Sequence, residues 1–150
     1  MPTGHSAYHA RRWQRSAEGA VYLLAWCDGL AVGHVLVTRE SKYELVRARL
    51  GRFPEVNALG VAPAYRRRGV ARALMEAAAQ IAVSMGSARL GLAVEPDNQP
   101  AMALYRALDL RRHPDIDPVD VWTWIDETGA EHEERDRCTY WSWACQPGTG

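Results

Sequence analysis

The pattern of apolar residues through the first part of the chain predicts three strands. Val21–Cys27 is a short apolar run, and the Asp-Gly pair that follows it is the strongest short-range signal for a hairpin turn. Ala31–Thr38 is therefore the expected return strand. Glu55–Val61 is expected as the next strand, and it ends near Pro63 because proline cannot continue a central strand.

Several stretches before, between and after these strands are expected to be helical. Ala7–Ser16 is predicted as a short polar helix, and Ser41 and Glu44 form a capping-box pattern with Ser41 at the N-cap of a second helix. A long helix is expected to begin at Gly69. Its predicted apolar stripe is Val70, Leu74, Ala77, Ile81 and Met85. A further helix follows the turn Glu95–Gln99, with the stripe Ala101, Leu104, Tyr105 and Leu108.

The last third of the chain predicts a hairpin of two aromatic strands. Leu90–Val94 is a short apolar strand between the two longer helices. Val119–Ile125 and Cys138–Trp143 hold four of the six tryptophans, so we expect these two strands to pair. His113–Asp120 is expected as a loop and Asp126–Asp136 as an acidic turn or loop. The order of elements predicts an α/β (α+β) fold, a mixed sheet with helices on its faces.

Length and composition are those of an ordinary globular domain. The chain has 150 residues, 47% of them hydrophobic and 24% charged, so we expect residues 1–150 to form a single domain. Cys27, Cys138 and Cys145 are odd in number and lack CxxC spacing, which argues against a disulfide framework and against a metal site. We expect a cytoplasmic protein with no membrane partner, because no apolar run is long enough to cross a bilayer and the first residues contain no apolar signal region.

Charge is unevenly divided along a chain that is neutral as a whole. Residues 1–75 carry 12 basic and 5 acidic groups, whereas residues 76–150 carry 6 basic and 13 acidic groups. The neutral total gives no support to a nucleic-acid partner. The division favours one basic site and one acidic site on the same protein. Of the 18 basic residues, only Lys42 is a lysine.

The chemistry is most clearly indicated where the third strand passes into the long helix. A helix start exposes unpaired N–H groups at the positive end of its dipole, and the two together bind anions. Gly69 and Ala71 are small enough to let a phosphate approach the backbone closely. The arginines at the same end are Arg66, Arg67, Arg68 and Arg72. A solvated basic helix cap is the alternative interpretation.

The spacing Arg-x-x-Gly-x-Ala after a Val-x-Pro strand end resembles motif A of the GNAT superfamily, the acetyl-CoA-dependent N-acetyltransferases. A second match resembles motif B of that family, a strand followed by Asn-x-x-Ala-x-x-Leu-Tyr. Its residues are Val94, Asn98, Ala101, Leu104 and Tyr105. The resemblance implies a central mixed, mostly antiparallel sheet with helices on both faces and a splay between its two central strands. It also implies acetyl-CoA as co-substrate and no metal.

The resemblance extends to the cofactor site residue by residue. Leu59, Gly60 and Val61 match the strand whose backbone pairs with the pantetheine arm, and one amide there would donate to the thioester oxygen. The residues that match the pyrophosphate turn are Arg66, Arg67, Arg68, Gly69, Val70, Ala71 and Arg72. Asn98 matches a side chain that helps to hold the cofactor arm, although asparagine is also common in turns near helix starts.

Two residues match catalytic positions of the family. Tyr105 matches the residue that protonates the departing thiolate, and a phenol with a pKa of about 10 can do so at neutral pH. Core packing is its alternative role. Glu55 lies eleven residues before Arg66, the spacing at which histone-acetylating members carry a basic glutamate. A water chain is the alternative base, and an exposed strand-end carboxylate is the alternative role of Glu55. His34 is an outside candidate for the base.

The chain also departs from the family pattern. About 20 residues precede the first clear strand, where the family has a strand and two helices, so we expect an abbreviated N-terminus. Asp109 and Leu110 replace the usual Gly-Phe after motif B. The acidic segment His113–Asp136 either borders the acceptor pocket, where it would favour a cationic amine, or is a solvated loop.

These patterns together predict an N-acetyltransferase. An amine acceptor, on a small molecule or on a protein, would attack acetyl-CoA directly, with no covalent enzyme intermediate. The alternative is a non-catalytic acyl-CoA-binding regulatory module on the same fold, because a fold and a cofactor site do not prove turnover. The tryptophan-rich strands suit either a homodimer surface or the core.

Overall fold

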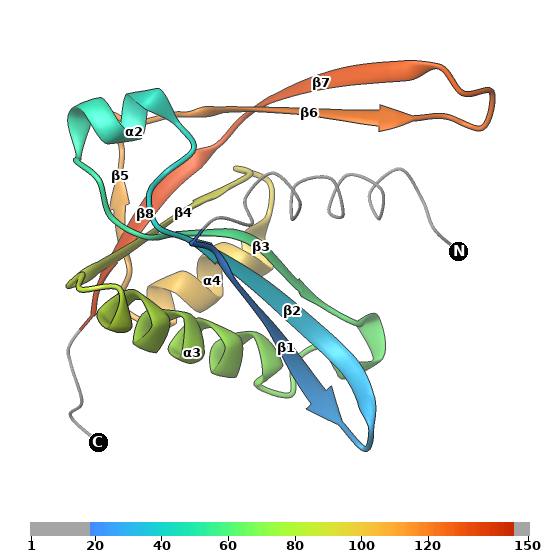
Figure 1. The fold of residues 1–150 in the computed structure, drawn as a ribbon, viewed down its shortest axis with the longest axis horizontal. Coiled ribbons are helices and arrows are strands. Elements are labelled where there is room, and N and C mark those ends of the chain that lie inside the picture. Colours follow the sequence, from blue (N-terminus) through green and yellow to red (C-terminus); the bar gives the residue numbers. More distant parts are fainter. Residues whose placement is uncertain (1–18, 146–150) are drawn as a thin grey trace.

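The computed structural model describes residues 19–145, whose strands form one six-stranded sheet and a separate hairpin (Figure 1). The large sheet has the order β1-β2-β3-β4-β8-β5. Its strands are β1 (Val21–Cys27), β2 (Leu30–Thr38), β3 (Glu55–Val61), β4 (Arg89–Val94), β5 (Arg111–His113) and β8 (Thr139–Ala144). The hairpin consists of β6 (Val119–Ile125) and β7 (Glu131–Arg137). The helices are α2 (Glu44–Arg49), η1 (Pro63–Tyr65, a 3-10 turn), α3 (Val70–Ser84) and α4 (Gln99–Ala107). The predicted helix Ala7–Ser16 and the expected short N-terminus lie outside the described residues.

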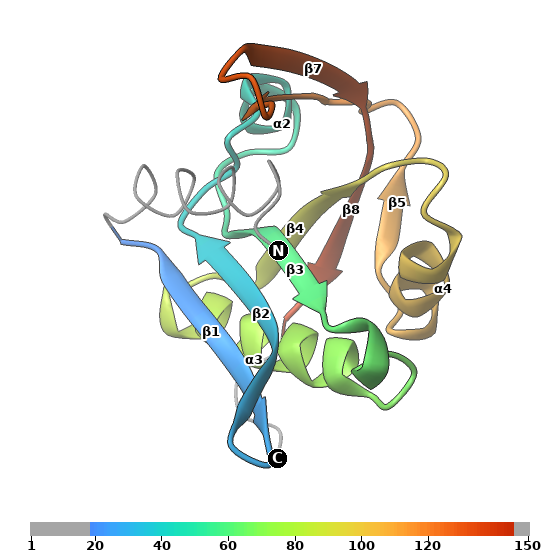
Figure 2. The same cartoon turned by 90° about the vertical axis from the view of Figure 1, so that its right-hand side faces the viewer.

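The two central strands of the sheet, β3 and β4, run parallel and soon separate. They pair only at Glu55 with Gly91 and at Val56 with Leu92, whereas the other neighbouring strands pair antiparallel. Figure 2 shows β3 and β4 diverging from this short contact. Beyond Val56, one side of β3 faces the opening instead of another strand. The predicted mixed, mostly antiparallel sheet with a central splay is confirmed.

A β-bulge lies at the point where the splay begins. On β2, Leu36 pairs with Ala58 of β3 and Val37 pairs with Val56, so Asn57 is an extra residue in β3. A bulge bends its strand and increases the local twist. The bulge therefore helps to turn β3 away from β4.

Helices cover both faces of the sheet, as predicted. On one face, α3 and α4 pack into the main core, which includes Met75 and Tyr105 from the helices and Leu90 from β4. On the other face, Val46 of α2 packs in a smaller cluster around Tyr140 of β8. The two clusters leave β3 and β4 in the middle of the protein, where the splay opens.

The apolar stripe predicted for α3 is partly wrong. Leu74 is buried as expected, but Ala77 is exposed. The buried residues of the helix are Leu74, Met75, Ala78 and Ala82. Small and apolar residues occupy both the predicted stripe and the face that is buried. Helical periodicity therefore could not decide which face of α3 packs against the sheet.

The cap predicted for the short helix is also wrong. The N-cap of α2 is Tyr43, which makes no side-chain capping hydrogen bond. Ser41 is buried, and its Oγ accepts a hydrogen bond from the backbone N–H of Tyr43 at 3.0 Å. The hydroxyl is thus used in the turn that precedes α2.

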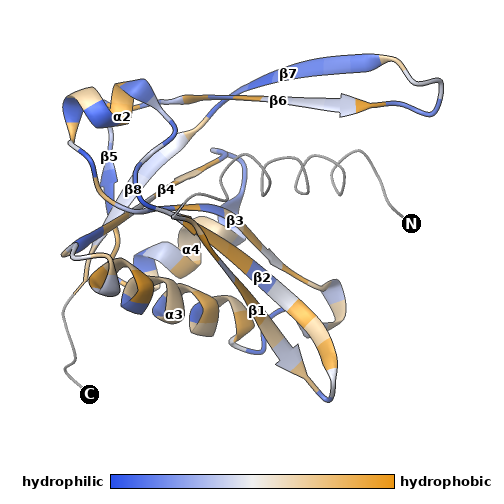
Figure 3. Ribbon diagram, viewed as in Figure 1, coloured by the Kyte–Doolittle hydropathy of each residue, from blue (hydrophilic) through white to orange (hydrophobic). Residues whose placement is uncertain are grey.

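The pairing predicted for the tryptophan-rich strands is wrong. β8 lies inside the large sheet, between β4 and β5, whereas β6 pairs with β7 in a hairpin that projects from the sheet (Figure 1). β7 was expected as a loop because every residue in it is polar, which Figure 3 shows as a hydrophilic strand. Its partner strand supplies the contacts: Trp122 Nε1 donates to Asp136 at 2.9 Å, and Trp124 stacks on His132. The short strand β5 was not predicted.

Asp109 follows the C-cap of α4 and lies in the left-handed backbone region, with φ of 64°. Its N–H donates to Arg106 O at 3.0 Å, and the N–H of Leu110 donates to Tyr105 O at 2.9 Å. These are the two hydrogen bonds of a Schellman motif, whose left-handed position is usually glycine. Asp109 thus adopts a backbone conformation that glycine favours, while Leu110 is buried in the core.

We expect Asp109→Gly to stabilise the protein by about 0.5–1 kcal/mol, because glycine removes most of the cost of the left-handed conformation. For a chain of this size that corresponds to a rise in Tm of about 1–4 °C. Thermal unfolding followed by circular dichroism measures it. Asp109→Ala is the control and should give no gain, since alanine keeps the strain. An equal gain from both variants would contradict this account.

Candidate active site

The splay between β3 and β4 holds a cleft of about 230 Å³. The residues that line it are Lys42, Tyr43, Val56, Asn57, Ala58, Leu59, Leu92, Ala93, Val94, Glu95, Asn98, Tyr105, Asp120 and Cys138. Among the predicted site residues, Leu59, Asn98 and Tyr105 meet here. The cleft is therefore bordered by both strands of the splay and by the start of α4.

Tyr105 is almost fully buried at the cleft, with 5% of its surface exposed. Its ring packs at a tilt against Trp141, with the ring centres 6.0 Å apart. Within residues 19–145 its hydroxyl has no hydrogen-bond partner. A buried hydroxyl without a partner costs about 1–3 kcal/mol and calls for an explanation, such as a ligand atom. Burial raises the pKa of Tyr105 to about 12, so the hydroxyl stays protonated at neutral pH.

Asn98 caps α4 and lines the cleft at the same time. Its Oδ1 accepts a hydrogen bond from the backbone N–H of Ala101 at 3.2 Å. Asn98 thus has the role at a helix start that the sequence analysis gave as its alternative. This bond uses only the amide oxygen, so the amide NH₂ group is left to donate elsewhere.

The turn after β3 presents the start of α3 without a side-chain cap. Gly69 is the N-cap with φ of 81°, and Arg67 also has a positive φ, 63°. A Cβ on Gly69 would meet no atom within 4 Å, so the glycine serves the backbone conformation rather than packing. The first N–H groups of α3 are therefore available to an anion.

The arginines around this turn are exposed, and several have contacts within the turn. Arg66 Nε donates to Val61 O at 3.3 Å, and the Arg68 guanidinium lies 5.3 Å from the ring centre of Tyr65. Arg72 pairs with Glu76 at 4.0 Å, one helical turn along α3. These contacts hold positive charge beside the start of α3.

Gly60 allows a close contact between β3 and β2. A Cβ there would lie 2.6 Å from Cε1 of His34, its pairing partner. His34 is stacked on Tyr22, and burial lowers the pKa of His34. His34 does not line the cleft, and its packing favours a structural role.

Glu55 is fully buried at the start of β3. Its carboxylate accepts hydrogen bonds from the Tyr140 hydroxyl at 2.8 Å and from the backbone N–H of Lys42 at 3.2 Å. Burial and the neighbouring negative charge of Glu55 raise the pKa of Tyr140. Glu55 is therefore not the exposed strand-end carboxylate that the sequence analysis gave as its alternative role. It does not line the cleft itself, whereas its neighbours Val56 and Lys42 do.

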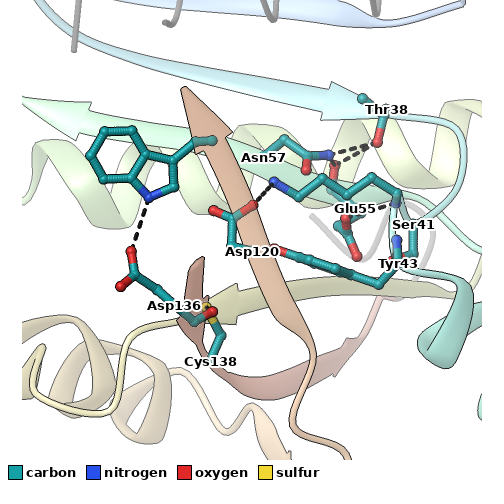
Figure 4. Close-up of polar contacts among 10 residues, drawn as sticks. Thr38, Ser41, Tyr43, Glu55, Asn57, Asp120, Asp136 and Cys138 are labelled. Atoms are coloured by element: carbon teal, nitrogen blue, oxygen red, sulfur yellow. Dashed lines mark hydrogen bonds and ion pairs between the residues drawn. The ribbon is translucent and has the colours of Figure 1, made fainter. Parts of the chain in front are cut away.

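Two charged residues of the cleft, Lys42 and Glu95, were missed as site residues by the sequence analysis, whereas Asp120 lies in the acidic segment His113–Asp136. The Nζ of Lys42 lies 2.7 Å from Oδ1 of Asp120, and Figure 4 shows Asp120 turned from β6 toward the segment that carries Ser41. Asp120 lines the cleft, so this part of the segment has the position of the first alternative, a border of the pocket. Its place in the cleft depends on how β6 lies against the sheet, which no local pattern encodes.

Cys138 also lines the cleft. Burial, together with the negative charges of Asp120, Glu95 and Asp136, raises the pKa of this thiol to about 11. A thiol in that environment is protonated at neutral pH and is a poor nucleophile.

Within residues 19–145 no group of three or more His, Cys, Asp or Glu side chains is placed to hold a metal ion. Over the same part of the chain, none of the helices has the length and apolar character to span a membrane.

Comparison with known families identifies the class of protein. Residues 2–110 match the model of the acetyltransferase (GNAT) family. The chain therefore belongs to the GNAT family, whose members use acetyl-CoA to acetylate amine acceptors.

Solved structures share this fold. A nourseothricin acetyltransferase is 27% identical, with a TM-score of 0.61 over 87% of this chain and 68% of that one. YncA, a putative acetyltransferase from Salmonella typhimurium solved with its cofactor acetyl-CoA, is 16% identical, with a TM-score of 0.61 over 94% and 73%. A ribosomal-protein-alanine N-acetyltransferase from Brucella melitensis is 18% identical, with a TM-score of 0.61 over 91% and 75%.

One curated relative matches over a shorter stretch. An uncharacterised protein of Mycobacterium leprae is 43% identical over 68 residues, which are 43% of this chain and 18% of that protein. The match thus spans less than a fifth of the length of this relative.

Proposed function

We propose that this chain transfers an acetyl group from acetyl-CoA to a primary amine in the cleft between β3 and β4. The observation that carries the proposal is the Tyr105 hydroxyl, buried at this cleft without a partner in the described part of the chain. A protonated phenol at the opening of the splay suits the protonation of a departing thiolate. The chain's membership of the GNAT family supplies the reaction class.

Acetyl-CoA would lie along the side of β3 that faces the splay. The backbone of Leu59, Gly60 and Val61 would pair with the pantetheine arm, and Asn98 would donate from its amide NH₂ group. The pyrophosphate would lie at the helix start. The residues proposed there are Arg66, Arg67, Arg68, Gly69, Val70, Ala71 and Arg72. The uncapped N–H groups of α3 and the exposed arginines support this placement.

The amine would attack the acetyl carbonyl carbon directly. A backbone amide of β3 at the splay would stabilise the oxyanion, and Tyr105 would protonate the leaving sulfur. Glu55 would accept the proton of the ammonium through water, because its carboxylate is buried next to the cleft rather than in it. The protonated state of Cys138 supports direct transfer over a covalent thioester on the enzyme.

We further propose that the acceptor is a small cationic amine. Asp120 and Glu95 both line the cleft, and carboxylates favour a positively charged ligand there. The likeness to a nourseothricin acetyltransferase is consistent with a small-molecule acceptor.

We also propose that the protein is cytoplasmic. The three cysteines form no disulfide, which supports this location. That two copies of the chain form a homodimer stays a prediction from the sequence.

Release of the CoA thiol with a panel of monoamines and diamines tests this function. We expect turnover with diamines to exceed turnover with neutral-tailed monoamines of the same length. Binding of acetyl-CoA without thiol release for any amine would instead support the regulatory-module alternative.

The helix-start turn is tested by Gly69→Ala. Alanine keeps the fold but strains the left-handed N-cap and places a methyl group where the pyrophosphate would lie. At about 100 Kd of acetyl-CoA, the wild type should gain about 2.7 kcal/mol, a rise in Tm of about 5–11 °C. We expect Gly69→Ala to lose most of this rise in a thermal melt.

Gly29→Ala is the matched control. Gly29 has φ of 80° and open space where an added methyl group would lie, but it belongs to the β1–β2 turn. Both variants should unfold at lower temperature, and only Gly69→Ala should lose the response to acetyl-CoA. If Gly69→Ala kept the full rise in Tm with acetyl-CoA, the pyrophosphate would not bind at this turn.

A further inference from the structure

The chain's only lysine lies in the proposed active-site cleft. Lys42 occupies the segment between β2 and α2 and lines the same cleft as Leu59 and Tyr105. Its backbone N–H donates to Oε1 of Glu55 at 3.2 Å, so the buried carboxylate anchors its main chain beside the start of the splay. The lysine side chain is 30% exposed. Its ammonium group is therefore accessible, while its backbone is fixed.

The Lys42 ammonium occupies the kind of position that the acceptor amine needs. Nζ lies 2.7 Å from Oδ1 of Asp120 and 5.0 Å from the ring centre of Tyr43, and all three residues line the cleft. A lysine side chain ends in a primary amine, which is the acceptor chemistry proposed above. The chain thus places a primary amine of its own in the site where it would acetylate others.

We propose that Lys42 is a self-acetylation site, modified within the same molecule by its own cleft. This inference rests on the proposed function, because the acetyl group comes from acetyl-CoA. An ion pair between partly exposed groups is weak, and the four-carbon stem of lysine rotates freely. Nζ can therefore leave Asp120 and turn toward the thioester without any change in the backbone.

The reaction is the same transfer with an internal acceptor. Nζ gives one proton to solvent by way of Asp120 and bonds to the acetyl carbonyl carbon. The bond from that carbon to the CoA sulfur breaks, and the sulfur takes a proton from Tyr105. The nitrogen loses a second proton, which restores the Tyr105 hydroxyl. The products are Nε-acetyl-lysine, the CoA thiol and one proton.

Acetylation of Lys42 would also change the site. It removes the positive charge and the ion pair, as lysine acetylation generally does. The Asp120 carboxylate would then lose its ion pair with the Lys42 ammonium. We therefore expect the acetylated protein to bind a cationic acceptor more tightly, seen as a KM lowered by about tenfold.

Mass spectrometry of tryptic peptides tests the proposal cleanly because the chain has no other lysine. The full chain is incubated with acetyl-CoA alone, quenched and digested. Trypsin cuts unmodified chain after Lys42 and cannot cut after acetyl-lysine, so modification joins residues 40–47 into one peptide. The control for chemical acetylation is the same chain unfolded in urea, and Lys42→Arg is the control for the site.

We expect the joined peptide to form at least about tenfold faster in the folded chain than in the unfolded one. Its first-order rate constant should not depend on protein concentration, as for a reaction within one molecule. An equal rate in unfolded chain, or a rate constant that grows with protein concentration, would overturn the proposal. Turnover of external amines without the joined peptide would overturn it while leaving the proposed function intact. Absence of both reactions would reject the proposed function as well.

Discussion

Tyr105→Phe is expected to lower kcat for acetyl transfer by about 10²–10⁴-fold, the usual contribution of general acid catalysis. The variant should leave the free energy of unfolding unchanged or slightly higher. The ring keeps its packing against Trp141, and the hydroxyl that is removed has no partner within residues 19–145. Thiol release measures kcat, and urea unfolding measures stability.

The control for this substitution is Tyr22→Phe, which removes a phenol from the partly exposed face of β1, away from the cleft. It should keep full activity. If Tyr105→Phe also kept kcat under conditions where chemistry limits the rate, Tyr105 would be a packing residue only.

The pH profile gives Tyr105 a second test. The acid works only while protonated, and burial raises its pKa to about 12. Its contribution is therefore present across the neutral range and is lost only as the pH rises through about 12. Deprotonation of the acceptor ammonium favours attack as the pH rises. We expect kcat/KM to rise up to about pH 10 without a descending limb, and a descending limb near pH 8 would contradict the assignment.

Glu55→Gln is expected to lower kcat by at least about 10²-fold, because the amide cannot take up the proton of the substrate ammonium. It should also destabilise the protein by about 1–3 kcal/mol. The carboxylate accepts from both the Tyr140 hydroxyl and the Lys42 N–H. The amide oxygen of glutamine can accept one of these bonds, but its NH₂ group cannot accept the other. The two effects have different origins and need a control that separates them.

Tyr140→Phe supplies that control. It removes the hydrogen bond to Glu55 but keeps the carboxylate and the aromatic ring in the core. We expect a similar loss of stability in urea unfolding with kcat within about tenfold of the wild type. If activity instead fell equally in both variants, Glu55 would act only by holding the local structure, and the water chain would be the better candidate for the base.

Local patterns in the sequence were sufficient to predict the elements on either side of the helix-start turn. The bounds of β3 are those predicted, Gly69 is the N-cap of α3, and Asn98 is the N-cap of α4. Each depends on residues close together in the chain: an alternating or apolar run, a glycine in the left-handed region, an asparagine cap. Tyr105 could be located because its spacing from Asn98 is fixed by one helix.

The C-terminal third could not be predicted in this way. β7 has only polar residues and is a strand because β6 pairs with it. β8 pairs with β4 in the large sheet instead of with β6. Tryptophans in two strands gave no means of distinguishing pairing with each other from pairing with other partners. Strand pairing depends on the neighbours available in three dimensions, which short-range propensity does not contain.

The sequence by itself determined the order of the main strands and helices, the helix-start turn with its arginines, and the position of Tyr105. Only the tertiary structure decided that Glu55 is buried under Tyr140 and that Lys42 meets Asp120 across 78 residues of chain. The physical reason is that local backbone conformation follows from neighbouring residues. The charge and depth of a cleft follow from which distant segments pack around it.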